Sequence, residues 1–142
     1  MDVRQRKDAG RPADAEIIAR VRRAYDDYSR GKFDAVMEWI HPEIVLVPAG
    51  GQAPIRGAGK YRAWMEPDAF EYQVVEPLEF RLNGDKLLVH VRSTIRGARS
   101  RIDAHFLSWG VLTLDDEGRT VRHEIYLDHE RETALAAAGL PA

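Results

Sequence analysis

Apolar residues in the first half of the chain recur at helical spacing. One stripe with three- and four-residue intervals predicts an amphipathic helix over residues 14–30, with Asp14 as its N-cap and Gly31 at its end. A shorter apolar pattern predicts a second helix at 33–41, closed by His41-Pro42. A third helix, at 58–66, presents Tyr61, Trp64 and Met65 on one side. The apolar stripe of the predicted helix at 14–30 consists of Ile17, Ile18, Val21, Ala24, Tyr25 and Tyr28.

After residue 67 the pattern changes to that of strands. We expect strands at 70–82, 87–95, 101–114 and 121–127, a short buried strand at 44–47, and a last helix at 130–138. Pro77 indicates an edge strand or a bulge, and Asn83-Gly84 a tight hairpin. Helices followed by an antiparallel meander predict an α+β fold: a cone-shaped, curved antiparallel sheet wrapped around the N-terminal helices, which pack on one face. Its open mouth is the expected ligand site.

Length and composition place limits on the class of protein. The 142 residues are typical of one domain, which we assign to residues 14–140, after a frayed terminus at 1–13. A net charge of −2 argues against nucleic-acid binding, and the lack of cysteine excludes disulfides and thiol nucleophiles. No signal segment and no membrane-spanning apolar run is evident, so we expect a cytoplasmic protein with no membrane partner.

Several motifs in order resemble one known family. They are Gly84-Asp85 at a hairpin, Leu112-Thr113-Leu114 before an acidic turn, Ile125-Tyr126-Leu127-Asp128, and the closing Ala134-Leu135 and Gly139-Leu140. Tyr28 to Ala35 and Ile55-Arg56-Gly57 agree in the first half. Together they resemble the SnoaL-like branch of the nuclear transport factor 2-like superfamily, over about residues 15–140. That resemblance implies a cone-shaped α+β barrel, related to the cystatin-like folds, with a pocket for small, largely apolar molecules.

The resemblance also shows which family mechanisms do not transfer. Polyketide cyclases, ketosteroid isomerases and limonene-type epoxide hydrolases share this fold. The isomerases' general-base aspartate falls on Val47, their oxyanion-stabilising acid falls on Gly110, and their first-helix tyrosine falls on Ala24 or Tyr25. An acid of the epoxide hydrolases falls on Ile125. The protein is therefore not expected to be a typical ketosteroid isomerase or limonene-type epoxide hydrolase.

Strand alternation selects His123 as the main candidate for chemistry. It shares a face with Val121, Ile125 and Leu127, and the acidic turn would place it opposite Leu112, near Gly110. A desolvated imidazole there can act as an acid or base, with Tyr25 donating a hydrogen bond into the pocket. The alternative is a core histidine bonded to a backbone carbonyl or to Tyr25. Expected ligand contacts are Tyr28, Val47, Tyr61, Trp64, Phe106, Ser108 and Leu112.

The positions of His90 and Arg92 depend on the register of the third hairpin. A turn centred between Gly97 and Ala98 places His90 opposite His105 on a solvated face, too far from His123 for a three-histidine metal site. A bulge before Ala104 would instead turn His90 and Arg92 into the pocket as ligand contacts. We expect no metal and no cofactor.

Leu107, Trp109 and Val111 share the outward face of their strand. Three large apolar side chains facing water would be costly, so we expect a homodimer through this face. Three functions remain open. The first is an acid–base enzyme of cyclase or isomerase type acting on a small apolar carbonyl compound. The second is a non-catalytic binding protein for a lipophilic metabolite. The third is a dimeric accessory domain with a vestigial, filled cavity.

Overall fold

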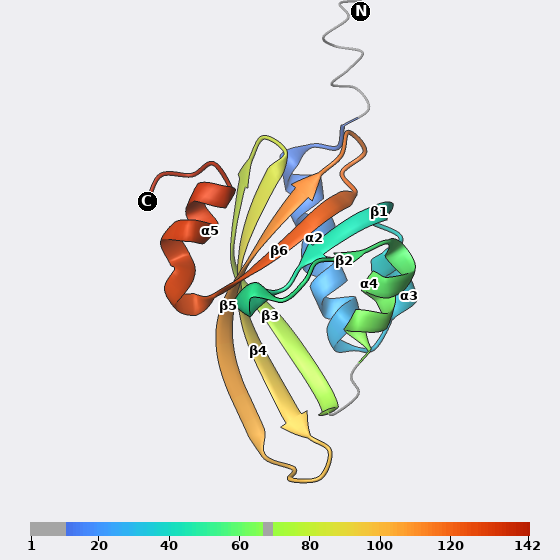
Figure 1. Ribbon diagram of the computed structural model, residues 1–142. Helices are drawn as coiled ribbons and strands as arrows, with labels where there is room; N and C mark the ends of the chain where they lie inside the picture. The colour runs from blue at the N-terminus through green and yellow to red at the C-terminus, as the bar shows by residue number, and fades with distance from the viewer. Residues whose placement is uncertain (1–10, 67–69) are drawn as a thin grey trace, which may run out of the picture.

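A computed structural model of the protein describes residues 11–66 and 70–142, in which helices pack against a curved sheet (Figure 1). The helices are α2 (Asp14–Ser29), α3 (Phe33–Met37), α4 (Ala58–Met65) and α5 (Arg131–Ala137), with 3₁₀ turns η1 (Ala49–Gly51) and η2 (Asp128–Glu130). The strands are β1 (Ile40–Val47), β2 (Ile55–Arg56), β3 (Phe70–Asn83), β4 (Lys86–Gly97), β5 (Asp103–Leu114) and β6 (Thr120–Leu127). The predicted α+β class is confirmed.

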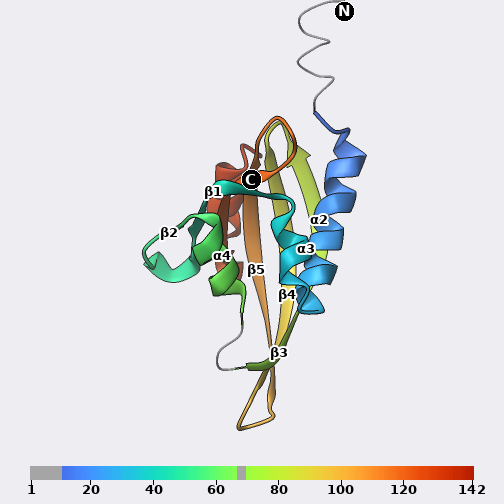
Figure 2. The ribbon, with the colours of Figure 1, turned by 90° about the vertical axis from the view of Figure 1, so that its right-hand side faces the viewer.

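The six strands form one sheet in the order β2-β1-β6-β5-β4-β3, which is not closed into a barrel. Figure 2 shows the N-terminal helices spread across the sheet, with α2 along β3 at one end and α4 beside β1 towards the other. Neighbours from β3 to β6 are antiparallel, as predicted, whereas β1 runs parallel to β6. The second helix is shorter than the predicted 33–41, because Ile40 already pairs with Thr120 of β6.

Two apolar clusters lie between the sheet and the three N-terminal helices. Ile17 of α2 is 1% exposed and packs with Leu87 and Val89 of β4. Val36 of α3 and Tyr61 of α4 pack with the fully buried residues of β1, Ile44 and Leu46. The helical stripe read from the sequence therefore covers the concave face, as burial of apolar area requires.

The opposite face of the sheet is covered by α5, so the expectation that helices occupy one face is wrong for this helix. Leu135 of α5 packs with Leu88, Trp109 and Val111, and Trp109 and Val111 are 5% and 0% exposed. A second copy is not needed to cover these two side chains. Leu107 alone of the predicted interface stays exposed, so the dimer remains a prediction with less apolar surface to support it.

Both long hairpins have definite registers. Leu112 lies opposite His123 between β5 and β6, as predicted. Between β4 and β5, His90 lies opposite Trp109, not opposite His105, because the turn is longer than predicted and includes Arg101 with φ 54°. The β4–β5 pairing has no bulge.

Two smaller predictions concern the ends of the fold. Pro77 lies on β3, the outermost strand, beside a break in its register with β4, so it marks both an edge and a bulge. Residues 1–10 of the predicted frayed segment lie outside the described residues, but Arg11 is held by a 2.6 Å hydrogen bond to the Gly84 carbonyl. In the described part of the chain, no helix is long and apolar enough to cross a membrane.

Candidate functional site

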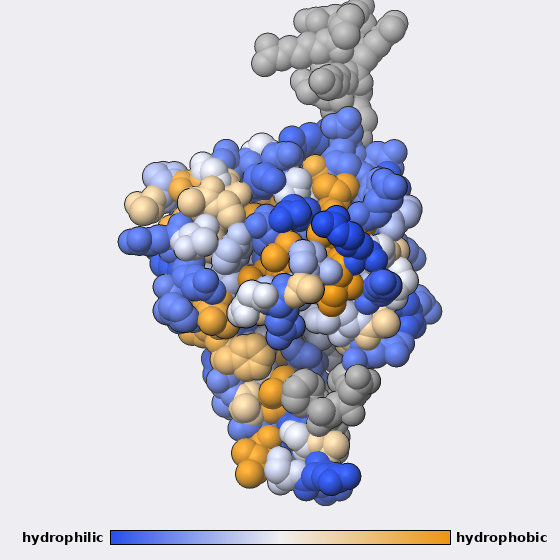
Figure 3. All heavy atoms as spheres, viewed as in Figure 1, coloured by the Kyte–Doolittle hydropathy of each residue, from blue (hydrophilic) through white to orange (hydrophobic). Residues whose placement is uncertain are grey.

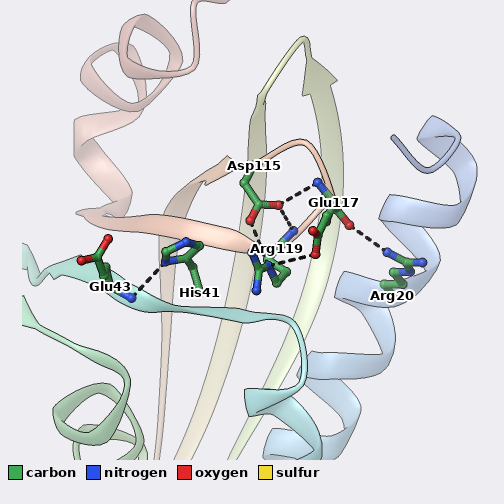
Figure 4. Close-up of polar contacts among 6 residues, drawn as sticks. All are labelled: Arg20, His41, Glu43, Asp115, Glu117 and Arg119. Atoms are coloured by element: carbon green, nitrogen blue, oxygen red, sulfur yellow. Dashed lines mark hydrogen bonds and ion pairs between the residues drawn. The ribbon is translucent and has the colours of Figure 1, made fainter. Parts of the chain in front are cut away.

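The turn between β5 and β6 sets the position of His123. The Asp115 carboxylate accepts hydrogen bonds from the backbone N–H groups of Glu117 and Arg119 and pairs with the Arg119 guanidinium at 2.9 Å (Figure 4). Burial alone would raise the pKa of Asp115, but these hydrogen bonds together outweigh it and lower the pKa. Arg20 of α2 donates to the Glu117 carbonyl, which ties the helix to the turn.

His123 points into the concave side of the sheet, where α4 supplies its partner. The hydroxyl group of Tyr61 lies 2.8 Å from Nδ1 of His123. For a His123 with a purely structural role, we predicted a hydrogen bond to a backbone carbonyl or to Tyr25. The observed partner is Tyr61 instead. Burial lowers the pKa of His123 to about 4, so the ring is neutral at pH 7.

The hydrogen bond from Tyr61 also fixes which ring nitrogen carries the proton. Burial, with smaller contributions from Tyr25 and Tyr28, raises the pKa of Tyr61, so its phenol stays protonated. Within the described residues His123 is the sole partner of this hydroxyl group, which would otherwise be a buried, unpaired donor. Tyr61 therefore donates to Nδ1, and Nε2 of His123 carries a proton.

Tyr25 and His123 border one space above Gly110. A Cβ atom built on Gly110 would lie 3.5 Å from Nε2 of His123 and 3.6 Å from the Tyr25 hydroxyl oxygen. Neither atom has a hydrogen-bond partner in the described part of the chain. Burial raises the pKa of Tyr25, so both groups are neutral donors. Two donors that border the same space can bind and stabilise an oxygen that gains negative charge.

These groups lie in a cavity of about 400 Å³ between the helices and the sheet. Eight of the predicted site residues line it: His123, Tyr25, Tyr28, Tyr61, Trp64, Phe106, Ser108 and Leu112. Trp64 is 40% exposed and its ring meets His123 edge-on at 6.4 Å, so it lies at the opening. Further apolar side chains reach the surface on the projecting β4–β5 hairpin (Figure 3). The cavity volume of about 400 Å³ rules out the filled cavity that the third candidate function assumed.

Three predicted ligand contacts do not reach the cavity. Val47 pairs with Glu124, on the opposite face of β1 and β6 from Leu46 and His123. His90 and Arg92 lie on the outward face, because no bulge reverses them. The His90 ring instead stacks on Trp109 at 3.9 Å, and its Nε2 lies 3.0 Å from Asp128.

The sequence reading missed Gln73 and Ser93, two polar residues that line the cavity. Gln73 accepts a 2.8 Å hydrogen bond from the Tyr28 hydroxyl group, whose pKa burial raises to about 12. Ser93 continues the buried period-two series Leu87, Val89 and Val91. A hydroxyl in such a series is a signal that the inward face changes from core to cavity.

The described lining of the cavity carries almost no charged side chains. Among the described lining residues, none is a carboxylate and Arg20 is the one permanent cation. Its guanidinium lies 4.1 Å from the centre of the Trp39 ring and pairs with Glu16 at 2.9 Å. No group of three or more potential metal ligands occurs in the described ranges.

The neutral state of His123 predicts a pH dependence of stability. In the unfolded chain its pKa returns to about 6.5, so lowering the pH from about 6.5 to about 4 protonates the unfolded state first and destabilises the fold. The shift corresponds to at most about 3 kcal/mol. Urea unfolding should show a smaller acid loss for His123→Gln than for wild type. His129→Gln, at an exposed site, should keep the wild-type profile. Equal profiles for all three proteins would contradict the burial of neutral His123.

Comparison with known proteins agrees with this architecture. The SnoaL-like domain model matches residues 21–123, so the chain belongs to the SnoaL-like domain family. No curated protein matches the sequence significantly.

Solved structures share the fold at low identity. A nuclear transport factor 2-like protein of unknown function from Burkholderia pseudomallei is 18% identical, with a TM-score of 0.70 over 84% of this chain and 95% of its own. An LEH-like epoxide hydrolase from M. tuberculosis is 19% identical, with a TM-score of 0.69 over 89% of this chain and 94% of its own. SalBIII, an epoxide hydrolase/cyclase-like enzyme in pyran ring formation, is 18% identical, with a TM-score of 0.66 over 89% and 93%.

Proposed function

We propose that the protein is a cofactor-independent acid–base enzyme of cyclase or isomerase type, acting on a small, largely apolar carbonyl compound. The observation that carries the proposal is the pair of neutral donors, His123 Nε2 and the Tyr25 hydroxyl group, above Gly110. A carbonyl oxygen placed there accepts two hydrogen bonds. The pair then stabilises the negative charge that forms on this oxygen when an adjacent C–H bond loses its proton.

The proton acceptor is not a carboxylate of the described lining, which contains none. A water molecule or a basic group of the substrate takes the proton, while Tyr61 holds His123 in the donor tautomer through Nδ1. Relatives described as hydrolase- or cyclase-like enzymes support a catalytic role for a cavity of this fold.

The same lack of a carboxylate favours a second candidate function, a binding protein for a lipophilic metabolite. Such a protein needs the apolar cavity and the two donors for affinity and orientation, but no proton acceptor. The two functions differ in whether a bound ketone exchanges its acidic hydrogens with solvent.

Proton exchange provides the test. We expect the wild-type protein to accelerate deuterium exchange at the α-carbons of 2-tetralone, a small bicyclic ketone, followed by proton NMR in D₂O. Tyr25→Phe removes one donor and should slow the catalysed exchange by about 10–100-fold. Tyr126→Phe is the matched control, because that hydroxyl group bonds Glu124 and does not line the cavity.

The outcomes separate the candidates. Saturable binding of 2-tetralone that Tyr25→Phe weakens, without exchange above the buffer rate, would support the binding protein. Exchange that is equal in wild type and Tyr25→Phe would contradict the assignment of the donor pair.

A further inference from the structure

Ser93 is a largely buried residue whose hydroxyl group opens on the cavity. It lies on β4, opposite Phe106 of β5, is 4% exposed and lines the cavity. Its Oγ has no hydrogen-bond partner within the described residues. Because no described side-chain oxygen or nitrogen is both buried and unpaired, this Oγ is accessible from the cavity, where a polar atom of a ligand or a water molecule can bond to it.

Gln73 adds a second polar group next to Ser93. Val75 of β3 lies opposite Ser93, and Gln73 is two residues further along the same strand. Gln73 and Ser93 are therefore diagonal neighbours across two adjacent strands, about 7–8 Å apart at their backbones. Because Oε1 of Gln73 accepts the hydrogen bond from the Tyr28 hydroxyl group, its Nε2 group is left as a donor, with no acceptor in the described chain.

Ser93 and Gln73 lie far from the donor pair of His123 and Tyr25. Ser93 is level with Phe106, four residues before Gly110 on β5, which is about 13 Å at 3.3 Å per residue. Between the two levels lies the apolar side chain of Val91 on β4. Ser108 lies between them too, on the same inward face.

We propose that Ser93 and Gln73 form a second polar subsite, and that the ligand is an elongated, apolar, uncharged molecule with an oxygen function at each end. One oxygen binds His123 and Tyr25, and the other accepts from Gln73 Nε2 and exchanges a hydrogen bond with Ser93 Oγ. The ligand is uncharged because the one permanent cation of the described lining, Arg20, is engaged by Glu16 and Trp39. This inference rests on the donor pair of the proposed function.

Two rigid probes of equal shape test the subsite. 4-Phenylphenol has one hydroxyl group, and 4,4′-biphenol has a second one at the far end of the same apolar rod. We expect wild type to bind 4,4′-biphenol about tenfold more tightly by calorimetry, the effect of one ordinary net hydrogen bond. Ser93→Ala should remove this advantage and leave the affinity for 4-phenylphenol unchanged.

Thr94→Val is the matched control, since its hydroxyl group lies one residue away and contacts His105 outside the cavity. It should keep the tenfold difference between the probes. Tyr25→Phe should weaken both probes equally.

The results distinguish the two proposals. If Tyr25→Phe weakens both probes but 4,4′-biphenol has no advantage, or keeps it in Ser93→Ala, the subsite is wrong and the donor pair stands. If Tyr25→Phe changes neither affinity, or if neither probe binds wild type, the donor pair is wrong and the subsite inference falls with it.

Discussion

Replacing Gly110 with alanine should lower the affinity for 4-phenylphenol about 100-fold while leaving the protein at least as stable as wild type. The added Cβ would lie 3.5 Å from His123 Nε2 and 3.6 Å from the Tyr25 hydroxyl oxygen, in ordinary contact with both. It would occupy the space where a ligand oxygen accepts their hydrogen bonds. Two lost hydrogen bonds of about tenfold each give the expected effect.

Stability separates this effect from damage to the fold. Gly110 lies inside β5 with no backbone strain that requires glycine, so alanine should stabilise the strand by about 0.5–1 kcal/mol. Urea unfolding measures that change. Gly59→Ala on α4, where the new Cβ meets open space, is the control and should bind the probe like wild type. Wild-type affinity in Gly110→Ala would show that ligands do not bind above this residue.

Leu135→Ala on α5 should lower the free energy of unfolding by about 2–5 kcal/mol, without change in the cavity. Leu135 is 1% exposed and packs against Leu88, Trp109 and Val111 on the outward face of the sheet. Its truncation leaves a void beside large apolar side chains that the rest of the helix cannot fill.

The measurement is urea unfolding with Thr133→Ala as the control, an exposed position on the same helix. A loss below about 0.5 kcal/mol would mean that α5 does not cover this face in solution. In that case Trp109 and Val111 would again be available for a second copy of the chain.

The sequence was sufficient to predict the strand partner of His123, because the acidic turn limits the possible registers of the β5–β6 hairpin. Leu114 and Thr120 frame a short connection held by Asp115, so the partner of His123 could be counted along the strands. The β4–β5 turn does not limit the register of its hairpin in the same way. Glycine at 97 suggested a tight turn, whereas residues 98–102 all belong to a longer loop, so that His90 lies opposite Trp109 and not opposite His105.

The contacts made by helices were harder to predict. Periodicity shows that Tyr61 faces the core, but its bond to His123 depends on how α4 docks on β1 and β6. The side of the sheet that α5 covers was equally hard to predict, and was predicted wrongly, since its small apolar face could pack on either side. Leu88, Trp109 and Val111 form an apolar surface on the outward face that α5 can cover, but this surface can be recognised only when the strand registers are known.

The outermost strand has a consequence for how these molecules behave at high concentration. β3 is fourteen residues long and, within the described part of the chain, one of its edges has no neighbouring strand, so another chain could add a strand there. Pro77 has no N–H to offer such a strand, and the register break beside it bends the edge. Glu76 and Glu79 add negative charge on either side. We therefore expect Pro77, the bulge and the two charges to oppose growth of the sheet into aggregates.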